Sequence, residues 1–433
     1  MNLERLKRIF ADQGCKKVYV KTLAKNDDSK HQPYLGGDEI FNLFPTSEIK
    51  AISSESWDRE RFIATIDFAW IAEDGALFQA PNTKFILYPK YPEVRLSGFL
   101  RGCSNGPSRV MNTPLYGRLL FLSVSTAGRI LGYAAFPDSQ IAAELRAINT
   151  QQEGVFATFN LSNSDNRTIL LNELARIHRL DWITSKRLDR LGNIMACDAP
   201  NCGGYTLEAE LGITPNGYSE PDFLGWELKQ FGVDNFNRIG SAVITLMTPE
   251  PTEGLYVSQG VDYFIRTYGY PDQNNRPDRL NFGGIHKAGV RHERTRLTME
   301  LIGFDGVTGK IRSSTGRIVL VDEQGNEAAA WSFASMLKHW NRKHNQACYV
   351  PSLSANQPVR QYHYGNLVTL GVDTDFQLFL QQMFIGNIYY DPGIKMENVS
   401  TRPTVKRRSQ FRIKSSFLGN LYKSSEVVDV THC

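Results

Sequence analysis

The spacing of apolar residues changes part-way along the chain, and this change constrains the fold more than any other feature. Between Lys16 and about Val155 the apolar residues form short or alternating runs, separated by Gly, Pro, Asn and Asp. Examples are VYVKTL, FIATIDFAWI, KFILYP, RLLFLSVS and RILGYAAF. Closely spaced short strands are typical of barrels, so we expect an all-β pseudobarrel here. Short helices are expected at 1–15 and 36–44.

Helical spacing begins in the segment 168–191, which is predicted to be a helix. The apolar residues with this spacing are Leu170, Leu171, Leu174, Ile177 and Leu180. The polar stretch 146–168 before it is typical of a linker, although VFATF within it could form a strand. Strand and helix patterns then alternate, as in an α/β domain. The chain is therefore expected to hold two domains, 1–160 and 161–433.

Composition excludes several classes of protein. The chain has no run of 18 apolar residues and no signal-peptide pattern, so we expect no membrane span and a cytoplasmic location. Its six cysteines are dispersed, and only Cys197 and Cys202 lie close together. One such pair is a weak zinc signal, so free thiols or loop residues are the expected state, and a disulfide framework is not. The net charge of +4 does not by itself indicate a nucleic-acid partner.

The segment 204–231, GYTLEAELGITPNGYSEPDFLGWELKQF, contains the most informative pattern, D-x₄-E-x-K. Glu227 and Lys229 are two residues apart, so in a strand they point to one face while Leu228 points to the other. Asp222 precedes that strand across the turn-like PDFLG and can therefore lie beside Glu227. We expect two carboxylates and one ammonium group to converge.

This combination of groups suits phosphodiester hydrolysis. Carboxylates hold Mg²⁺ through few ligands and leave room for water and phosphate, and the ion lowers the pKa of a bound water. Lys229 could orient that water and offset phosphate charge. Glu208, on the predicted helix TLEAELGI, could supply a third carboxylate. The alternative is an ordinary half-exposed strand whose polar residues face water.

TLEAELGI followed by PDFLGWELK resembles the MvaI/BcnI family of restriction endonucleases, which share a fold with the mismatch-repair nicking enzyme MutH. The likeness continues at 296–305, 332–351 and 388–400. It implies an α/β MutH-like restriction-endonuclease fold and a Mg²⁺-dependent enzyme. By position, it implies that Asp222 and Glu227 bind metal, that Lys229 is the catalytic lysine and that Glu208 completes the site.

Basic residues outside this centre are candidates for contacting DNA, because arginine and lysine pair with guanine and with phosphate. Eight Lys or Arg residues lie between Lys395 and Lys423 against one acid, Glu397, which could accept from a cytosine amino group. The alternative is solvated surface charge. The candidates in the catalytic half are Arg291, Arg294, His363, Lys395, Glu397, Arg402, Arg407 and Arg408.

The front of the chain has a resemblance of its own. VYVKTLAKND, the later HQ and a helix ending in LFP resemble the N-terminal effector domain of the EcoRII restriction enzyme, a DNA-binding pseudobarrel. The likeness extends to YPKYPEVRLSGFLRG at 88–102. The implied DNA-contacting residues are Lys21, Lys25, Asn26, Asp27, His31, Gln32, Lys90, Glu93, Arg95 and Arg101. The alternative is a solvated hairpin with a KND turn.

Both resemblances involve families associated with CCWGG or CCSGG sites. They imply a monomeric type IIE enzyme that binds two copies of its site on double-stranded DNA, one of them an effector copy. Two other functions stay open: a MutH-like nicking enzyme that depends on partner proteins, and a non-catalytic, sequence-specific DNA-binding regulator. The intact Glu208, Asp222, Glu227 and Lys229 set argues against the regulator.

Overall fold

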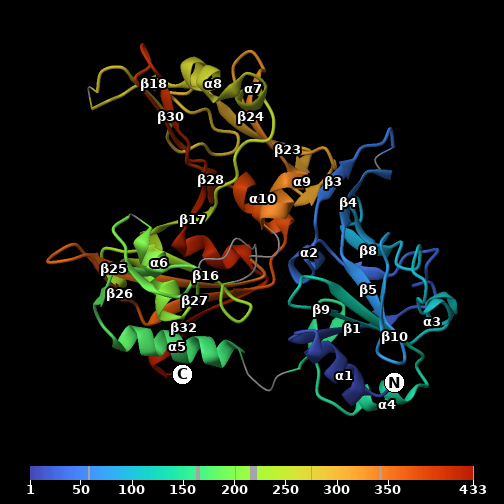
Figure 1. The fold of residues 1–433 in the computed structure, drawn as a ribbon. Coiled ribbons are helices and arrows are strands. Elements are labelled where there is room, and N and C mark those ends of the chain that lie inside the picture. The colour runs from blue at the N-terminus through green and yellow to red at the C-terminus, as the bar shows by residue number, and fades with distance from the viewer. Residues whose placement is uncertain are drawn as a thin grey trace. The chain divides into compact units, whose positions relative to one another are not determined.

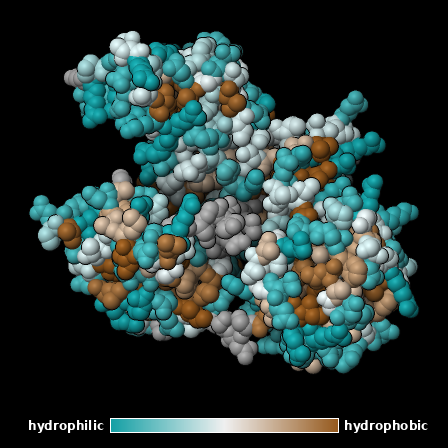
Figure 2. Space-filling view, viewed as in Figure 1, coloured by the Kyte–Doolittle hydropathy of each residue, from teal (hydrophilic) through white to brown (hydrophobic). Residues whose placement is uncertain are grey.

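The computed structural model describes residues 1–56, 59–161, 166–199, 201–214, 222–274, 276–340 and 344–432. The chain is mixed α/β and rich in sheet, and it divides into two compact units, Met1–Ser164 and Asp165–Cys433 (Figure 1). Within these ranges no helix is long and apolar enough to cross a membrane. The visible surface is largely hydrophilic with separate hydrophobic patches (Figure 2).

Two sheets dominate the first unit, which is called unit 1 below. The seven-stranded sheet has the order β11 (Gln151–Glu153), β12 (Phe156–Asn160), β1 (Lys17–Leu23), β9 (Arg118–Val124), β10 (Ile130–Ala135), β5 (Phe68–Ile71) and β6 (Leu77–Gln79). The five-stranded sheet has the order β2 (Tyr34–Gly36), β8 (Glu93–Ser97), β7 (Lys84–Tyr88), β4 (Arg61–Thr65) and β3 (Ile49–Ile52). The helices are α1 (Leu3–Asp12), α2 (Ile40–Leu43), α3 (Ser108–Asn112) and α4 (Gln140–Arg146). The expected helices at the chain start and near 36–44 are therefore present, the second reduced to one turn.

The predicted linker at 146–168 is only partly a linker. Its middle forms β11 and β12, and β12 pairs antiparallel with β1, with Val18 opposite Phe159. Phe156 and Thr158 alternate with more exposed neighbours, so this strand buries one face. VFATF thus adopts the strand alternative and extends the sheet of unit 1.

The second unit, called unit 2, is built around a sheet of six strands. Its order is β13 (Ile183–Thr184), β26 (Gln361–Tyr364), β25 (Gln346–Ala355), β27 (Leu367–Val372) and β32 (Ser424–Asp429), with β16 (Glu227–Gly232) parallel to β25. Helices α5 (Asn166–Arg179) and α6 (Cys202–Glu210) share one buried core with this sheet. That core contains Leu170, Leu174, Leu207, Leu228 and Val350.

Smaller sheets complete unit 2. They are β14 (Lys186–Leu188) with β15 (Ile194–Ala196); β17 (Val243–Met247), β31 (Phe411–Lys414) and β28 (Ile388–Tyr390); β18 (Tyr270–Pro271), β19 (Arg279–Gly283), β29 (Gly393–Glu397) and β30 (Thr404–Lys406); β20 (Thr298–Ile302), β23 (Arg317–Val321) and β24 (Glu327–Ser332); and β21 (Phe304–Asp305) with β22 (Lys310–Ile311). The remaining helical elements are η2 (Phe236–Ser241), α7 (Leu255–Ser258), α8 (Gly260–Tyr268), α9 (Phe333–Trp340), α10 (Phe376–Phe384), η3 (Ser415–Leu421) and η4 (Val430–His432).

Two sequence predictions in this unit need correction. The helix expected at 168–191 ends at Arg179, because Asp181 takes a left-handed backbone conformation with φ 57° and β13 begins at Ile183. Cys197 and Cys202 are not free thiols, since they form a disulfide with Cα atoms 5.8 Å apart. This bond joins the residue after β15 to the first residue of α6.

Candidate active site

A tight turn places Asp222 beside strand β16. Phe223 and Trp226 exchange two backbone hydrogen bonds, of 3.0 and 2.8 Å. The two residues between them, Leu224 and Gly225, both have positive φ, 50° and 92°, as a type I′ turn requires. The turn reverses the chain, so that an Asp222 carboxylate oxygen accepts a hydrogen bond from the Leu228 amide at 2.9 Å.

The Leu224 conformation is unusual for a residue with a branched side chain. Positive φ costs such a residue about 1 kcal/mol or more and persists only where surrounding contacts hold it. Here the Asn166 side-chain amide of α5 donates to the Leu224 carbonyl at 3.0 Å. The position of Asp222 is therefore fixed by a strained turn that is tied to the neighbouring helix.

Strand β16 presents Glu227 and Lys229 on one face. Glu227 is only 2% exposed, and the Lys229 ammonium lies 2.6 Å from its carboxylate. The strand register places Glu227 opposite Ala347, which in turn pairs with Gly371. Both neighbours are small, and the Tyr422 ring packs against the backbone of Gly371, where any larger side chain would collide with it. Sequence spacing predicted this shared face, but it did not predict how deeply Glu227 is buried.

Two tyrosines that the sequence analysis missed border the same face. Tyr349 lies opposite Lys229 on β25, and its hydroxyl meets that of Tyr422 at 2.8 Å. Burial, with a further contribution from the negative charge of Glu227, raises the pKa of both tyrosines above the usual range. Both hydroxyls therefore stay neutral at physiological pH. No spacing rule could have linked Tyr422 to Glu227, because the two are far apart in sequence.

Helix α6 carries Glu208 and packs against β16, with Gly203 close to the Gln230 side chain. Glu208 therefore lies on an element that contacts the strand of Glu227. Among the described residues, however, no three acidic, histidine or cysteine side chains form a group that could hold a metal ion. The structure thus brings Asp222, Glu227 and Lys229 into one turn and strand, and it places Glu208 on the helix that packs against this strand.

The donor set fits a hard divalent cation such as Mg²⁺. This ion is commonly held by one or two carboxylates and keeps several waters. Asp222 and Glu227 supply two carboxylates from either side of one turn, and Lys229 supplies a positive charge next to them. The neighbouring hydroxyls stay neutral, and no sulfur ligand is offered by these residues. The arrangement therefore matches Mg²⁺ chemistry better than zinc chemistry.

The part of the chain that holds these residues also matches the model of a known protein family. A model of the MvaI/BcnI restriction endonuclease family matches residues 171–422, which include β16, its turn and α6.

The chain belongs to the MvaI/BcnI restriction endonuclease family.

Solved structures resemble parts of the chain. A complex of the restriction endonuclease MvaI with its cognate DNA substrate has 18% identity, covers 61% of this chain and 99% of that chain, and gives a TM-score of 0.45. The B3 domain of the UbaLAI restriction endonuclease, with cognate DNA, has 18% identity, covers 36% of this chain and 98% of that chain, and gives a TM-score of 0.23. No curated protein sequence matches the chain.

Within the MvaI/BcnI-type unit, two predicted DNA-contacting residues lie on one sheet face. Lys395 and Glu397 of β29 form an ion pair at 3.0 Å, and Arg279 of β19 lies 3.6 Å from Glu397. Lys395 lowers the pKa of Glu397, which therefore stays ionised. The opposite face buries Phe282 and Met396. Arg279 was missed from the sequence, because only the register of β19 against β29 brings it beside Glu397.

The other predicted residues of this unit fall into two groups. Arg402, Arg407 and Arg408 are exposed. Arg291 forms an ion pair with Glu323, and Arg294 stacks over the Tyr270 ring at 5.4 Å. The last two side chains are engaged within the protein, so they would have to exchange partners to contact DNA.

His363 has a different environment. It stacks on His178 with ring centroids 5.4 Å apart, and it lies 3.2 Å from an Asp181 carboxylate oxygen. Burial lowers its pKa. It sits opposite Leu353, toward the end of β25 that lies away from Ala347 and hence from Glu227. The structure therefore places His363 in an aromatic cluster, apart from the acidic turn.

In unit 1, the two predicted DNA-contacting segments meet. The Arg95 guanidinium of β8 donates to the backbone carbonyls of His31 and Gln32, at 3.3 and 3.2 Å. Its other nitrogens bind the Glu93 carboxylate at 3.0 and 3.1 Å, and this pairing raises the pKa of Arg95. The Gln32 amide also donates to Ser97 at 3.2 Å. These contacts join residues 24–33, called the front loop below, to β8.

Several other predicted residues of unit 1 are placed individually. Lys25, Asn26 and His31 are exposed on the front loop. Lys21 lies over the Tyr34 ring and Lys90 over the Tyr91 ring.

Asp27 differs from the prediction. It is 5% exposed, and its carboxylate accepts hydrogen bonds from the Ala24 and Tyr34 amides at 2.9 and 3.1 Å. Asp27 therefore shapes the front loop from within and does not face outward.

A buried arginine holds the front loop from the interior of unit 1. Arg118 has no exposed surface, and its guanidinium donates to backbone carbonyls of both the front loop and the segment 110–115. The accepting carbonyls include those of Ala24, Asp27, Val110, Met111 and Leu115. Burial lowers its pKa. Nothing in the local sequence distinguished this arginine from a surface one.

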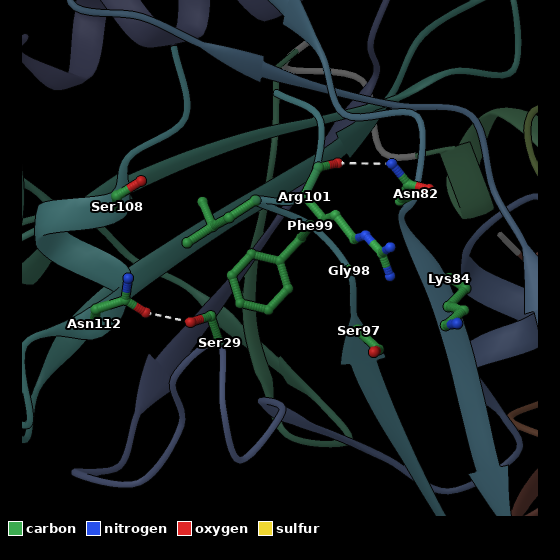
Figure 3. A pocket seen from close by; sticks show the side chains of 10 residues that line it. Ser29, Asn82, Lys84, Ser97, Gly98, Phe99, Arg101, Ser108 and Asn112 are labelled. Atoms are coloured by element: carbon green, nitrogen blue, oxygen red, sulfur yellow. Dashed lines mark hydrogen bonds between the residues drawn. The ribbon is translucent and has the colours of Figure 1, made fainter. Parts of the chain in front are cut away.

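A polar pocket of about 550 Å³ adjoins the front loop (Figure 3). Arg101 and Lys84 lie on one side of it, and a hydrogen-bonded pair, Ser29 and Asn112, lies on the other. Among the residues that the structure describes, the pocket lining contains no acidic residue. The Asn82 amide donates to the Arg101 carbonyl at 3.0 Å and so fixes the loop that carries Arg101. Lys84 and Asn82 were not predicted, because both lie in an ordinary strand-and-turn pattern.

Proposed function

We propose that the chain is a Mg²⁺-dependent type II restriction endonuclease that hydrolyses double-stranded DNA at a CCWGG-like site. The observation that carries this proposal is the turn at Asp222, which sets its carboxylate beside the strand of Glu227 and Lys229. Membership of the MvaI/BcnI restriction endonuclease family supports it. The Asp222 and Glu227 carboxylates would hold the ion, and Glu208 would complete the site from α6.

Each residue has a distinct part in this proposal. When bound, Mg²⁺ would polarise the phosphoryl group and lower the pKa of a water molecule. The Lys229 ammonium would donate hydrogen bonds to a phosphate oxygen or to the attacking water, orient it and offset the charge that develops. Its ion pair with Glu227 keeps the ammonium in place before DNA arrives. The Leu224–Gly225 turn keeps Asp222 from moving away from the strand.

We further propose that unit 1 binds a second, effector copy of the site, as in a type IIE enzyme. Support comes from the front loop and β8, which present His31, Glu93 and Arg95 together. The acid-free pocket with Lys84 and Arg101 would take a DNA phosphate. The protein would act as a monomer on two copies of its site.

Plasmid cleavage tests both parts. Plasmids with no, one or two CCWGG sites would be incubated with Mg²⁺ or with EDTA, and the DNA ends mapped. We expect Mg²⁺-dependent cutting at CCWGG that is faster with two sites. Equal rates on one and two sites would remove the effector role and keep the nuclease.

Two alternatives remain as outcomes of the same experiment. Specific binding without cutting, in Mg²⁺ and in Mn²⁺ and at both CCWGG and CCSGG, would favour a non-catalytic regulator or a partner-dependent nicking enzyme. Nicking of one strand that appears only on addition of a cell extract would single out the nicking enzyme. The exposed effector-type surface of unit 1 favours the restriction enzyme.

A further inference from the structure

The hairpin formed by β14 and β15 exposes an unusual set of side chains. Leu191, at its tip, is 87% exposed, and Ile194 and Met195 on the returning strand are 69% and 43% exposed. Arg187 and Arg190 are exposed on the outgoing strand and tip. In the part of the chain that the structure describes, neither arginine has an acidic partner. Apolar and cationic side chains therefore share one small projection.

The tip is rigid, so this exposure is not the result of a loose loop. The Asp189 carboxylate accepts from the Leu191 amide at 2.8 Å and from the Asn193 amide and side chain at 2.9 and 3.0 Å. Gly192 supplies the positive φ of 84° that the turn needs. Asp189 is thus turned inward to hold the turn, and the two arginines outnumber this one acid in 187–195, so the tip keeps a net positive charge.

The base of the hairpin is clamped to the helix that carries Glu208. Thr206 of α6 exchanges hydrogen bonds of 3.1 Å with both the amide and the carbonyl of Lys186, and the Lys186 ammonium pairs with Glu210. The disulfide between Cys197 and Cys202 closes the other strand onto the same helix. The hairpin and α6 therefore move as one piece.

The tip also lies beside the residues that follow the C-terminal end of α6. Lys186, at the start of β14, contacts Thr206 and Glu210, and a Cβ added at Gly192 in the tip would lie 3.9 Å from the Thr214 side chain. The hairpin thus runs along α6 from its middle to beyond its C-terminal end. Glu208, a candidate residue of the cutting centre, lies in the last turn of the same helix.

We propose that this hairpin is a DNA wedge, with Leu191 and Ile194 entering the minor groove beside the cut site and Arg187 and Arg190 binding the flanking phosphates. Leucine, isoleucine and methionine are the side chains that proteins insert from the minor groove, and arginine accompanies them there. Each strand of the hairpin has only three residues. The projection is therefore short, and only the residues at and next to its tip would enter the groove. The proposal rests on the proposed nuclease function and extends it to how DNA is held.

The favoured ligand is DNA because of the charge on the tip. A protein partner for exposed leucine and isoleucine would be expected to avoid two arginines that have no acidic partner among the described residues, or to neutralise them with acids of its own. Duplex DNA supplies that negative charge along both sides of the groove. A second copy of this chain would have to bring acids to the tip, and it becomes an outcome of the test.

The test compares two variants. One is the double variant Leu191→Ser/Ile194→Ser, and the other is the single variant Val307→Ser. Val307 is 92% exposed on a different turn of the same unit, so it controls for loss of an exposed apolar side chain. Binding to a cognate duplex would be measured by fluorescence anisotropy in a Lys229→Met background, which is expected to bind without cutting. Sedimentation would report the oligomeric state.

We expect the double variant to bind at least about tenfold more weakly, because two apolar side chains lose their burial, while Val307→Ser binds as the parent does. Replacing guanine by inosine in the steps beside the cut removes the minor-groove amino group and its hydrogen bond to cytosine, and it leaves the major-groove edge unchanged. Inosine should change the affinity of the parent and leave that of the double variant unchanged.

Equal binding by all three proteins would overturn the wedge. Weaker binding with the same inosine response in parent and variant would overturn the minor-groove assignment, and a change in oligomeric state without a change in DNA binding would assign the hairpin to a protein contact. If the wild-type chain neither binds nor cuts DNA, the proposed function itself has failed, which is a separate result.

Discussion

The acidic turn of unit 2 and the front loop of unit 1 are both candidate DNA-contacting regions, but they are built differently. In unit 2 the candidate catalytic groups come from a few consecutive positions, and Glu227 is 2% exposed. In unit 1 the polar groups come from a loop, two strands and a pocket, and apart from Asp27 they are exposed or half-buried. A reaction centre needs a few groups with fixed positions, whereas a binding surface sums many weak contacts.

Because of this difference, substitutions should have different effects in the two regions. A change in unit 2 should remove a function that no neighbour can replace. A change in unit 1 should reduce affinity by a small step and alter its dependence on salt. The following experiments either confirm this contrast or remove it.

The largest effect is expected from Asp222→Asn and Glu227→Gln. Each keeps the shape of the side chain and removes the charge that would hold the ion, so the rate of DNA cleavage should fall by about 10³-fold or more. Asp262→Asn, an exposed carboxylate on α8, is the matched control and should cut normally. Cleavage is measured under single-turnover conditions. Activity within a few fold of wild type for either variant would place the metal site elsewhere.

Next in size is the effect of Arg118→Met on unit 1. The variant leaves the buried carbonyls of the front loop without donors, which should lower the free energy of unfolding by about 3 kcal/mol. Hydrogen exchange should rise in residues 24–33 and stay unchanged in β16. Arg129→Met, which removes an exposed ion pair with Asp67, should change stability little. Normal protection of the front loop in Arg118→Met would show that the arginine does not hold it.

Lowering the pH should destabilise mainly unit 2, because His286 takes up a proton when the unit unfolds. This histidine is fully buried and bonded to Gly284 and Thr295, and burial lowers its pKa to about 3. The unfolded chain takes up the proton near its ordinary pKa, so stability is lost as the pH falls from about 6.5 toward 3. The loss by pH 5 should be on the order of 2 kcal/mol.

Denaturant unfolding at pH 7 and pH 5 checks this prediction. His286→Gln should flatten the pH dependence, and His31→Gln, on the exposed front loop, should not. An unchanged slope in His286→Gln would mean that the histidine is not neutral in the folded protein.

The smallest effect is expected from Lys84→Gln and Arg101→Gln in the pocket. Each should weaken DNA binding by unit 1 only a few fold and reduce the salt slope by about 1, as expected for the loss of one phosphate contact. Lys50→Gln, an exposed lysine paired with Glu48, is the control. Binding is measured across a range of salt concentrations. A loss of cleavage comparable with that of Asp222→Asn would break the contrast between the two regions.

The sequence predicted contacts between neighbouring residues better than contacts between residues far apart in the chain. The face shared by Glu227 and Lys229 follows from the period of a strand, and the turn before it from PDFLG. The contacts of Tyr422, Arg118 and Arg279 depend on pairing between segments far apart in the chain, which no local pattern encodes. Asp27 was expected on the surface because acids usually are, yet two backbone amides hold it inside.

The fold shows the same division. Strands with apolar runs were found where the pattern placed them, and α6 follows the predicted helical segment TLEAELGI. The helix at 168–191 was predicted too long, because Leu180 continues the spacing but not the backbone. The strand at 156–160 was hard to predict because the residues around it are polar. The disulfide was not predicted because a reducing compartment was expected, and disulfides are rare there.

If the turn and strand at Asp222–Lys229 form the cutting centre, Lys229→Met should separate cleavage from binding. The rate of single-turnover cleavage and the affinity for the same cognate duplex would be measured side by side, with Mg²⁺ present for cleavage. We expect cleavage to fall by at least about 10²-fold while affinity stays within a few fold, because the ammonium acts on the reacting phosphate. Cleavage at the wild-type rate would contradict it.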